Sequence, residues 1–141
     1  MRISTKGRYG MAVMICLAEK KDRSQTVADI SQKLDVSKIY LEQVFALLKN
    51  AGLIQSIKGA QGGYFLSGTP QGVTAYDILR ATEPALFEPT EKSFSGAAEA
   101  VETALQNWVW SPLSGEIAKT LSAVTLQDLL EKSKKEYMFY I

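Results

Sequence analysis

Residues 26–50 contain two helical patterns separated by a short connection, and this arrangement limits the folds open to the chain. The first pattern begins at Thr26, which forms a capping box with Asp29, and the second begins after Ser37, a residue type that favours the N-cap. Two short helices joined by residues 35–37 predict a helix-turn-helix. Gly52 suits the left-handed position after the second helix. The apolar residues at helical spacing are Val27, Ile30 and Leu34 in the first helix, and Leu41, Val44, Phe45 and Leu48 in the second.

The segment after these helices predicts a β-hairpin. Residues 53–57 are mostly apolar or β-branched, residues 58–63 are rich in glycine, and residues 64–66 are apolar again. Two strand patterns around a glycine-rich turn are typical of a hairpin. A hairpin directly after a helix-turn-helix is a wing, so the sequence predicts a winged helix-turn-helix reading head at residues 1–66.

Helices are also predicted on both sides of this motif. Thr74 and Asp77 repeat the capping-box pattern and open a short helix that stops before Pro84. A helix near the N-terminus is indicated by the apolar stripe Tyr9, Ala12, Val13, Cys16 and Leu17.

The second half of the chain has a long helical pattern from residue 96. Pro112 lies inside it, so we expect a kink or break there, with Ser111 capping a second segment. Thr125 and Asp128 predict one more capped turn. The fold class is therefore mainly α with a small β-hairpin wing. The expected domains are a winged helix-turn-helix DNA-binding domain at 1–82, a loop at 83–95, and a long helix with a C-terminal tail at 96–141.

Composition narrows the chemistry. The chain has no histidine and a single cysteine, Cys16, which removes the commonest general base and any internal disulfide. We therefore expect no enzyme, no metal site and no cofactor. No apolar run is long enough to cross a membrane, and we expect a cytoplasmic protein. Residues 1–66 carry ten Lys and Arg against five Asp and Glu, whereas residues 67–141 carry six against ten. The basic first half favours a polyanionic partner.

Three parts of the reading head are candidates for contact with double-stranded DNA. The N-terminal part of a recognition helix reads base edges, a helix start attracts phosphate, and wing glycines let the backbone approach DNA closely. Each residue alone is also compatible with an ordinary solvated surface or turn. The candidates are Ser37, Lys38, Tyr40 and Gln43 in the recognition helix, Arg2, Ser4, Thr5, Lys6 and Arg8 at the first helix, and Lys58, Gly59, Gln61, Gly62, Gly63 and Tyr64 in the wing.

These motifs resemble a known family of bacterial regulators. Residues 1–10 (MRISTKGRYG), 40–43 (YLEQ), 47–53 (LLKNAGL) and 58–64 (KGAQGGY) are similar to the Rrf-two (Rrf2) family, the IscR/NsrR/CymR group. The resemblance runs through the whole chain. It implies a repressor that acts as a homodimer joined through the long helix and binds a partly palindromic operator. The half-sites would lie roughly 34–36 Å apart.

The apolar repeat of the long helix supplies the expected dimer interface. An effector pocket between the wing-bearing head and the long helix, near Trp108 and Trp110, is an alternative role for this region. The expected interface residues are Val101, Leu105, Trp108, Val109, Leu113, Ile117 and Leu121.

The chain departs from the iron–sulfur members of the family in one place. Those members carry three cysteines in the loop before the long helix, and residues 86–97 contain none. A thiolate-bound cluster of the usual type needs those ligands. Cys16 lies on the apolar stripe of the first helix, where we expect a small buried hydrophobe, with a redox sensor as the alternative.

The C-terminal tail is the remaining candidate site. It resembles the tail of CymR-type repressors of cysteine metabolism, which implies docking into cysteine synthase (O-acetylserine sulfhydrylase). Packing of the same residues on the long helix or on the dimer partner is the alternative. An interaction protein that docks this tail, with DNA binding secondary, is the rival function. The tail residues concerned are Tyr137, Phe139, Tyr140 and Ile141.

Overall fold

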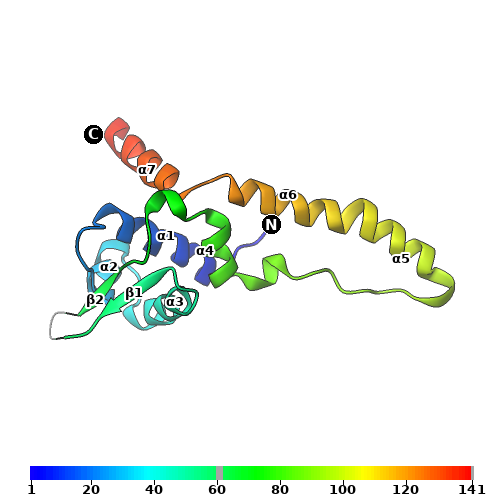
Figure 1. Cartoon of the computed structure of the whole chain (residues 1–141), viewed down its shortest axis with the longest axis horizontal. Helices are drawn as coiled ribbons and strands as arrows, with labels where there is room; N and C mark the ends of the chain where they lie inside the picture. Colours follow the sequence, from blue (N-terminus) through cyan, green and yellow to red (C-terminus); the bar gives the residue numbers. More distant parts are fainter. Residues whose placement is uncertain (60–61, 141) are drawn as a thin grey trace.

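The chain forms a rounded head from which a long arm projects (Figure 1). The computed structural model describes the backbone of residues 1–59 and 62–140 and the side chains of residues 1–59 and 62–135. The head contains α1 (Thr5–Glu19), α2 (Val27–Leu34), α3 (Lys38–Asn50), β1 (Ile54–Ile57), β2 (Gly63–Leu66), α4 (Ala75–Thr82) and α7 (Leu126–Tyr140). The arm, residues 88–122, contains α5 (Glu99–Leu105), a π-helical turn (Gln106–Trp110) and α6 (Ser111–Ser122). Short 3-10 turns cover Pro70–Gly72, Pro84–Phe87 and Gly96–Ala98. The predicted fold class is confirmed.

The core of the head surrounds α1. Val13, Met14 and Leu17 are buried on this helix, together with the predicted stripe residue Cys16. They pack in one cluster with the predicted apolar side of α2 and α3, which includes Ile30 and Phe45. Burial of these stripes fixes α3 against α1 and turns its other side to solvent.

All three predicted capping boxes are present. In each pair the Thr hydroxyl accepts a hydrogen bond from the Asp backbone N–H, and the Asp carboxylate accepts one from the Thr N–H. The N–H donation lowers the pKa of the Asp29 and Asp128 carboxyls. Ser37 caps α3 by accepting from the Tyr40 N–H at 3.4 Å, as predicted. The three pairs are Thr26 with Asp29, Thr74 with Asp77, and Thr125 with Asp128.

The hairpin is antiparallel, with Ile54 opposite Leu66 and Ile57 opposite Gly63. Gln25 attaches it to α1. The backbone of Gln25 exchanges two hydrogen bonds with Tyr64, at 2.8 and 2.9 Å, and its buried side-chain amide donates to the Cys16 carbonyl at 2.8 Å. The Cys16 carbonyl lies in the last turn of α1, where helix carbonyls lack an internal partner. The single residue Gln25 therefore provides a hydrogen-bond partner for the last turn of α1 and also positions the wing.

The arm differs from the sequence prediction at its centre. Ser111 has helical dihedral angles and its hydroxyl accepts from the Gln106 amide at 3.1 Å, so it does not cap a new segment. The predicted break and cap were wrong, because α5 and α6 continue through a π-helical turn (Figure 1). Pro112 has no N–H to donate, and a wider turn relieves its clash with the preceding carbonyls.

α7 is longer than the single turn predicted, and it returns to the head. Its Leu126 and Leu130 are buried in the head core. The Leu126 N–H donates to the Val73 carbonyl, and the Ala75 N–H donates to the Val124 carbonyl, both at 2.8 Å. The tail residues Tyr137, Phe139 and Tyr140 belong to this helix by their backbone, but their side chains and Ile141 lie outside the described residues.

Helix α4 lies close against α1, with Gly10 at the contact. A Cβ at Gly10 would lie 2.7 Å from the Thr82 methyl carbon, which is shorter than real contacts allow. Glycine therefore permits the approach of α4, which leads the chain into the arm. In the described part of the chain, no helix is both long and apolar enough to span a membrane.

Candidate nucleic-acid interface

The exposed side of α3 begins at its N-terminal turn. Lys38 and Gln43 are exposed there, while Leu41 and Val44 face the core, as the sequence predicted. Ser37, the cap, is also exposed. Two further exposed residues on this side, Ile39 and Glu42, were not among the predicted contacts. Their exposure depends on which side of α3 is buried, which the apolar spacing of α3 already indicated.

The start of α1 and the start of α3 form one surface. Arg2, Ser4, Thr5, Lys6 and Arg8, all predicted contacts, line a hollow of about 450 Å³. Tyr40 of α3 lines the same hollow, and its ring meets the Tyr9 ring edge-on with centroids 5.4 Å apart. The structure thus brings together two predicted groups that are separated by more than one helix in the sequence.

Glu83 occupies the N-terminal end of α1. Its carboxylate accepts a hydrogen bond from the Ser4 N–H at 2.8 Å and another from the Ser4 hydroxyl, while the Ser4 oxygen accepts from the Gly7 N–H. The sequence analysis assigned Ser4 to a phosphate, but its donors already bind an internal carboxylate. Glu83 follows α4 in the chain, so it links the start of the arm to the basic start of α1. No local sequence signal connects residues so far apart.

The wing places some predicted contacts at its tip and others in the core. Lys58 and Gly59 are exposed, and the Gly62 N–H closes the turn on the Gly59 carbonyl at 3.1 Å. Gln61 lies outside the described residues.

Two predicted wing contacts, Gly63 and Tyr64, have structural roles. Gly63 is buried, and a Cβ there would lie 3.0 Å from the Gln25 carbonyl oxygen, so a glycine is needed here for packing. Tyr64 is half-buried with its ring 4.7 Å from that of Phe45, a packing contact. Sequence spacing could not separate turn glycines from a packing glycine.

A helix-turn-helix, a following two-stranded wing and a basic start of α1 define a winged helix DNA-binding protein. The sequence profile of the Rrf2 family, described as an iron-dependent transcriptional regulator, matches residues 3–132. The transcriptional regulator CymR of Bacillus subtilis is 41% identical over the full length of both chains. The chain therefore belongs to the Rrf2 family of transcriptional regulators.

Solved structures of the family have the same fold. The structure of CymR, the global cysteine regulator of B. subtilis, covers 94% of this chain and 98% of its own, with a TM-score of 0.77 and 36% identity. The structure of IscR from T. potens covers 99% of this chain and 97% of its own, with a TM-score of 0.73 and 32% identity. The arm and the head are thus matched together.

The iron of the family description has no matching ligand set in the described residues. No group of three or more His, Cys, Asp or Glu side chains is placed there to hold a metal ion. Cys16 is buried, and burial raises the pKa of its thiol, which favours the uncharged form over the thiolate that binds metal. The donor set does not fit an iron–sulfur cluster.

The loop at the tip of the arm is held by a carboxylate instead. Glu102 of α5 is 7% exposed and accepts hydrogen bonds from the backbone N–H groups of Ser93 and Phe94 at 3.1 and 2.9 Å. Lys92 forms an ion pair with Glu99 at 2.8 Å beside it. These contacts tie the extended segment to α5 in the region where the sequence lacks cluster cysteines.

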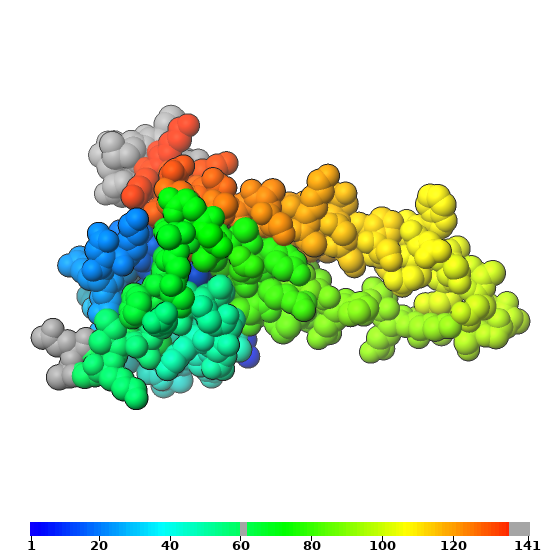
Figure 2. Space-filling model, viewed as in Figure 1, coloured from blue at the N-terminus to red at the C-terminus, as the bar shows by residue number. Residues whose placement is uncertain are grey.

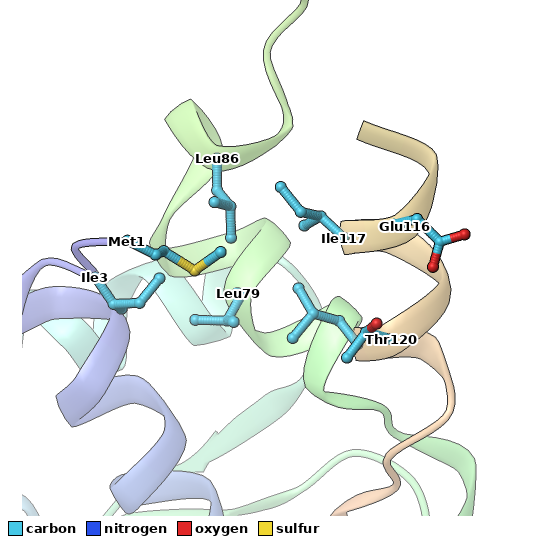
Figure 3. Close-up of a pocket in the computed structure, with 8 residues that line it drawn as sticks. Met1, Ile3, Leu79, Leu86, Glu116, Ile117 and Thr120 are labelled. Carbon is cyan, nitrogen blue, oxygen red and sulfur yellow. The ribbon is translucent and has the colours of Figure 1, made fainter. Parts of the chain in front are cut away.

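An apolar pocket of about 320 Å³ lies where the arm meets the head (Figure 3). The suggested effector site near Trp108 and Trp110 is not this pocket, since neither residue lines it and Trp108 is 82% exposed. Ile117 and Leu121, expected in the dimer interface, face this pocket. Its lining is Met1, Ile3, Leu79, Leu86, Glu116, Ile117, Thr120 and Leu121.

We predict that Glu83→Gln increases DNA affinity a few-fold at low salt. The amide still accepts a hydrogen bond from Ser4, but a negative charge bonded to this residue of the basic hollow is removed. The gain should shrink as salt rises, because salt screens exposed charges. Fluorescence anisotropy with a random-sequence duplex measures both effects.

Glu88→Gln is the matched control for this prediction. Glu88 is exposed in the same stretch of chain and loses the same charge, yet no hydrogen bond joins it to Ser4 among the described contacts. Its affinity should change less. A weaker binding of Glu83→Gln would show that the Glu83 charge holds α1 in its binding geometry rather than opposing phosphate.

Proposed function

We propose that this regulator is a repressor that binds a partly palindromic operator as a homodimer. The observation that carries the proposal is the exposed start of α3, with Lys38 and Gln43 beside the basic hollow of α1. An amide such as that of Gln43 pairs with an adenine edge in the major groove, and lysines neutralise phosphates. The strands β1 and β2 lie on the side of the head away from the outer part of the arm (Figure 1). The wing tip would contact the flanking backbone through Lys58.

A second copy of the chain would cover the arm. α5 buries only Glu102, and α6, described along its whole length, buries no residue. Several apolar side chains are exposed instead, with Val101 at 55%, Trp108 at 82% and Leu113 at 54%. A row of exposed apolar residues on an extended helix indicates an interface. Figure 2 shows the outer part of the arm, around α5, projecting beyond the head.

The π-helical turn supports the interface. An apolar residue at every fourth position drifts by about 40° per repeat around an α-helix of 3.6 residues per turn. A π-helical turn is wider and rotates by a smaller angle per residue, so it offsets part of this drift. The turn at 106–110 lies between Leu105 and Leu113 of the repeat. It therefore helps to keep the predicted interface residues on one side of a straight arm.

The genes of cysteine and sulfur metabolism are the proposed targets. The support is the likeness to B. subtilis CymR, which covers both chains completely at 41% identity. The tail would carry the signal by docking into cysteine synthase. In α7 the residues from Glu131 to Lys135, directly before the tail, are exposed.

We predict that Gln43→Ala weakens operator binding by about 1–3 kcal/mol and relaxes the preference at one base pair, because a base-edge contact is lost. Lys58→Ala should weaken binding similarly on all sequences and flatten the salt dependence, because a phosphate contact is lost. Affinities for the operator and for random DNA, measured across a salt series, distinguish base reading by Gln43 from phosphate contact by Lys58. Equal losses for Gln43→Ala on both DNAs would contradict base reading.

We predict that Trp108→Lys converts the dimer into a monomer, because a charge cannot be buried at the interface without a partner. Operator affinity should then fall at least about a hundredfold as two linked half-site contacts become separate ones. Sedimentation and anisotropy measure the two effects. Asn107→Lys, exposed on the neighbouring position, should remain dimeric. A dimeric Trp108→Lys variant would place the interface elsewhere.

Deletion of Tyr140 and Ile141 should abolish binding to purified cysteine synthase and leave operator affinity unchanged, since a docked tail is separate from α3. Calorimetry with the enzyme and anisotropy with the operator test this. Lys135→Ala, an exposed change earlier in α7, is the control and should retain both activities. Enzyme binding by the truncated chain would contradict docking, and loss of operator binding would favour a structural role for the tail.

A further inference from the structure

Ile39 is exposed where most large apolar side chains of α3 are hidden. It is 74% exposed, whereas Leu41, Val44, Phe45 and Leu48 of the same helix are fully buried. Ile39 lies in the first turn of α3, directly after Lys38. A lone exposed apolar residue needs no explanation on an ordinary surface. This one lies at the end of a helix proposed to enter the major groove.

Ile39 shares its side of α3 with Gln43. Residues four positions apart are neighbours on a helix surface, and the buried residues occupy the opposite side. Ala46 continues the same row and is also exposed, with a side chain too small to hold the helix away from a groove. Lys38 and Glu42, also four positions apart, lie together along one edge of this row. The reading side of α3 therefore presents a branched hydrocarbon next to an amide.

Hydrocarbon and amide groups select different features of DNA. An isoleucine side chain has no group that can bind a phosphate or a base by hydrogen bonding. In the major groove, thymine presents a methyl group at C5, and apolar side chains contact it. We propose that Ile39 contacts a thymine methyl group and makes this regulator select thymine at one position of each half-site. This inference rests on the proposed operator binding by α3.

The expected position lies close to the base pair read by Gln43. Side chains at i and i+4 are about 5–6 Å apart. Successive bases of one strand rise about 3.4 Å. The selected thymine should therefore lie within one or two base pairs of the Gln43 contact.

The expected change in operator affinity follows from the apolar surface of one thymine methyl group. Burial of one such group favours binding by a factor of about four. A symmetric operator contains two of these contacts, so loss of both should lower the operator affinity of the dimer by roughly fifteenfold.

The experiment begins with an operator selected from a random duplex library by the full-length chain. Each thymine is then replaced by uracil, which lacks only the C5 methyl, at matching positions of the two half-sites. Fluorescence anisotropy gives the affinity of each duplex. At one position, we expect the uracil replacement to lower the affinity of the wild-type protein by roughly fifteenfold. The Ile39→Ala variant should bind the thymine and uracil duplexes of that position with equal affinity.

Ile57→Ala is the matched control. Ile57 is a second exposed isoleucine, 46% exposed in β1 of the wing, and it is not on α3. This variant should keep the thymine preference at the Ile39 position. Ile39→Val removes one methyl from the side chain and retains its branching, so it should keep part of the preference. Thermal melting of each variant checks that the head remains folded.

The outcomes separate this inference from the proposed function. If the selection yields no preferred sequence, operator binding itself is contradicted. If an operator emerges but wild type and Ile39→Ala have the same uracil profile, the thymine contact is overturned and operator binding stands. If the folded Ile39→Ala variant loses the same affinity for the operator and for random duplexes, Ile39 contributes to DNA binding without selecting a base. This result also overturns the proposal.

Discussion

Burial of α1 is the constraint on which the rest of the head depends. α1 contacts α2, α3, α4, α7 and β2, and its residues Val13, Met14 and Leu17 are buried at the centre of the core. α3 can present Lys38 and Gln43 to DNA only because its apolar side is held against α1. The basic N-terminal end of the same helix forms the hollow with Tyr40. One helix thus supports the recognition helix and supplies the neighbouring cationic surface.

The arm has the opposite character, since its shape does not come from a core of its own. It leaves the head next to Glu83, which is bonded to Ser4, and it returns through the backbone bridge between Thr74 and Thr125. Both ends are therefore fixed to the head, while the apolar side chains between them are exposed, namely Val101, Trp108, Val109 and Leu113. Exposed apolar side chains along an extended helix are typical of an interaction surface, which is why we propose that a second copy covers the arm. Because both ends of the arm are fixed to the head, its placement is coupled to α1.

Local signals predicted most of the fold. The capping pairs at Thr26, Thr74 and Thr125 each involve residues three apart, so the sequence displays both partners. The contacts that it missed join distant segments: Glu83 with Ser4, Gln25 with Cys16 and Tyr64, and α7 with the head. The role of Ser111 was misjudged because a kink or break was expected at Pro112, whereas a π-helical turn accommodates the proline in a continuous helix. Among the candidate site residues, the apolar spacing of α3 correctly predicted that Lys38 and Gln43 are exposed. It could not show that Gly63 is buried under Gln25.

The tip of the arm explains how this chain differs from the iron-dependent description of its family. Glu102 accepts two backbone hydrogen bonds from the loop at Ser93 and Phe94, and Lys92 pairs with Glu99 next to it. A carboxylate that accepts two N–H groups orders the loop without a metal ligand. The segment between residues 86 and 97 contains no cysteine. The loop is therefore held by the hydrogen bonds of Glu102 in the region where other family members place thiolate ligands.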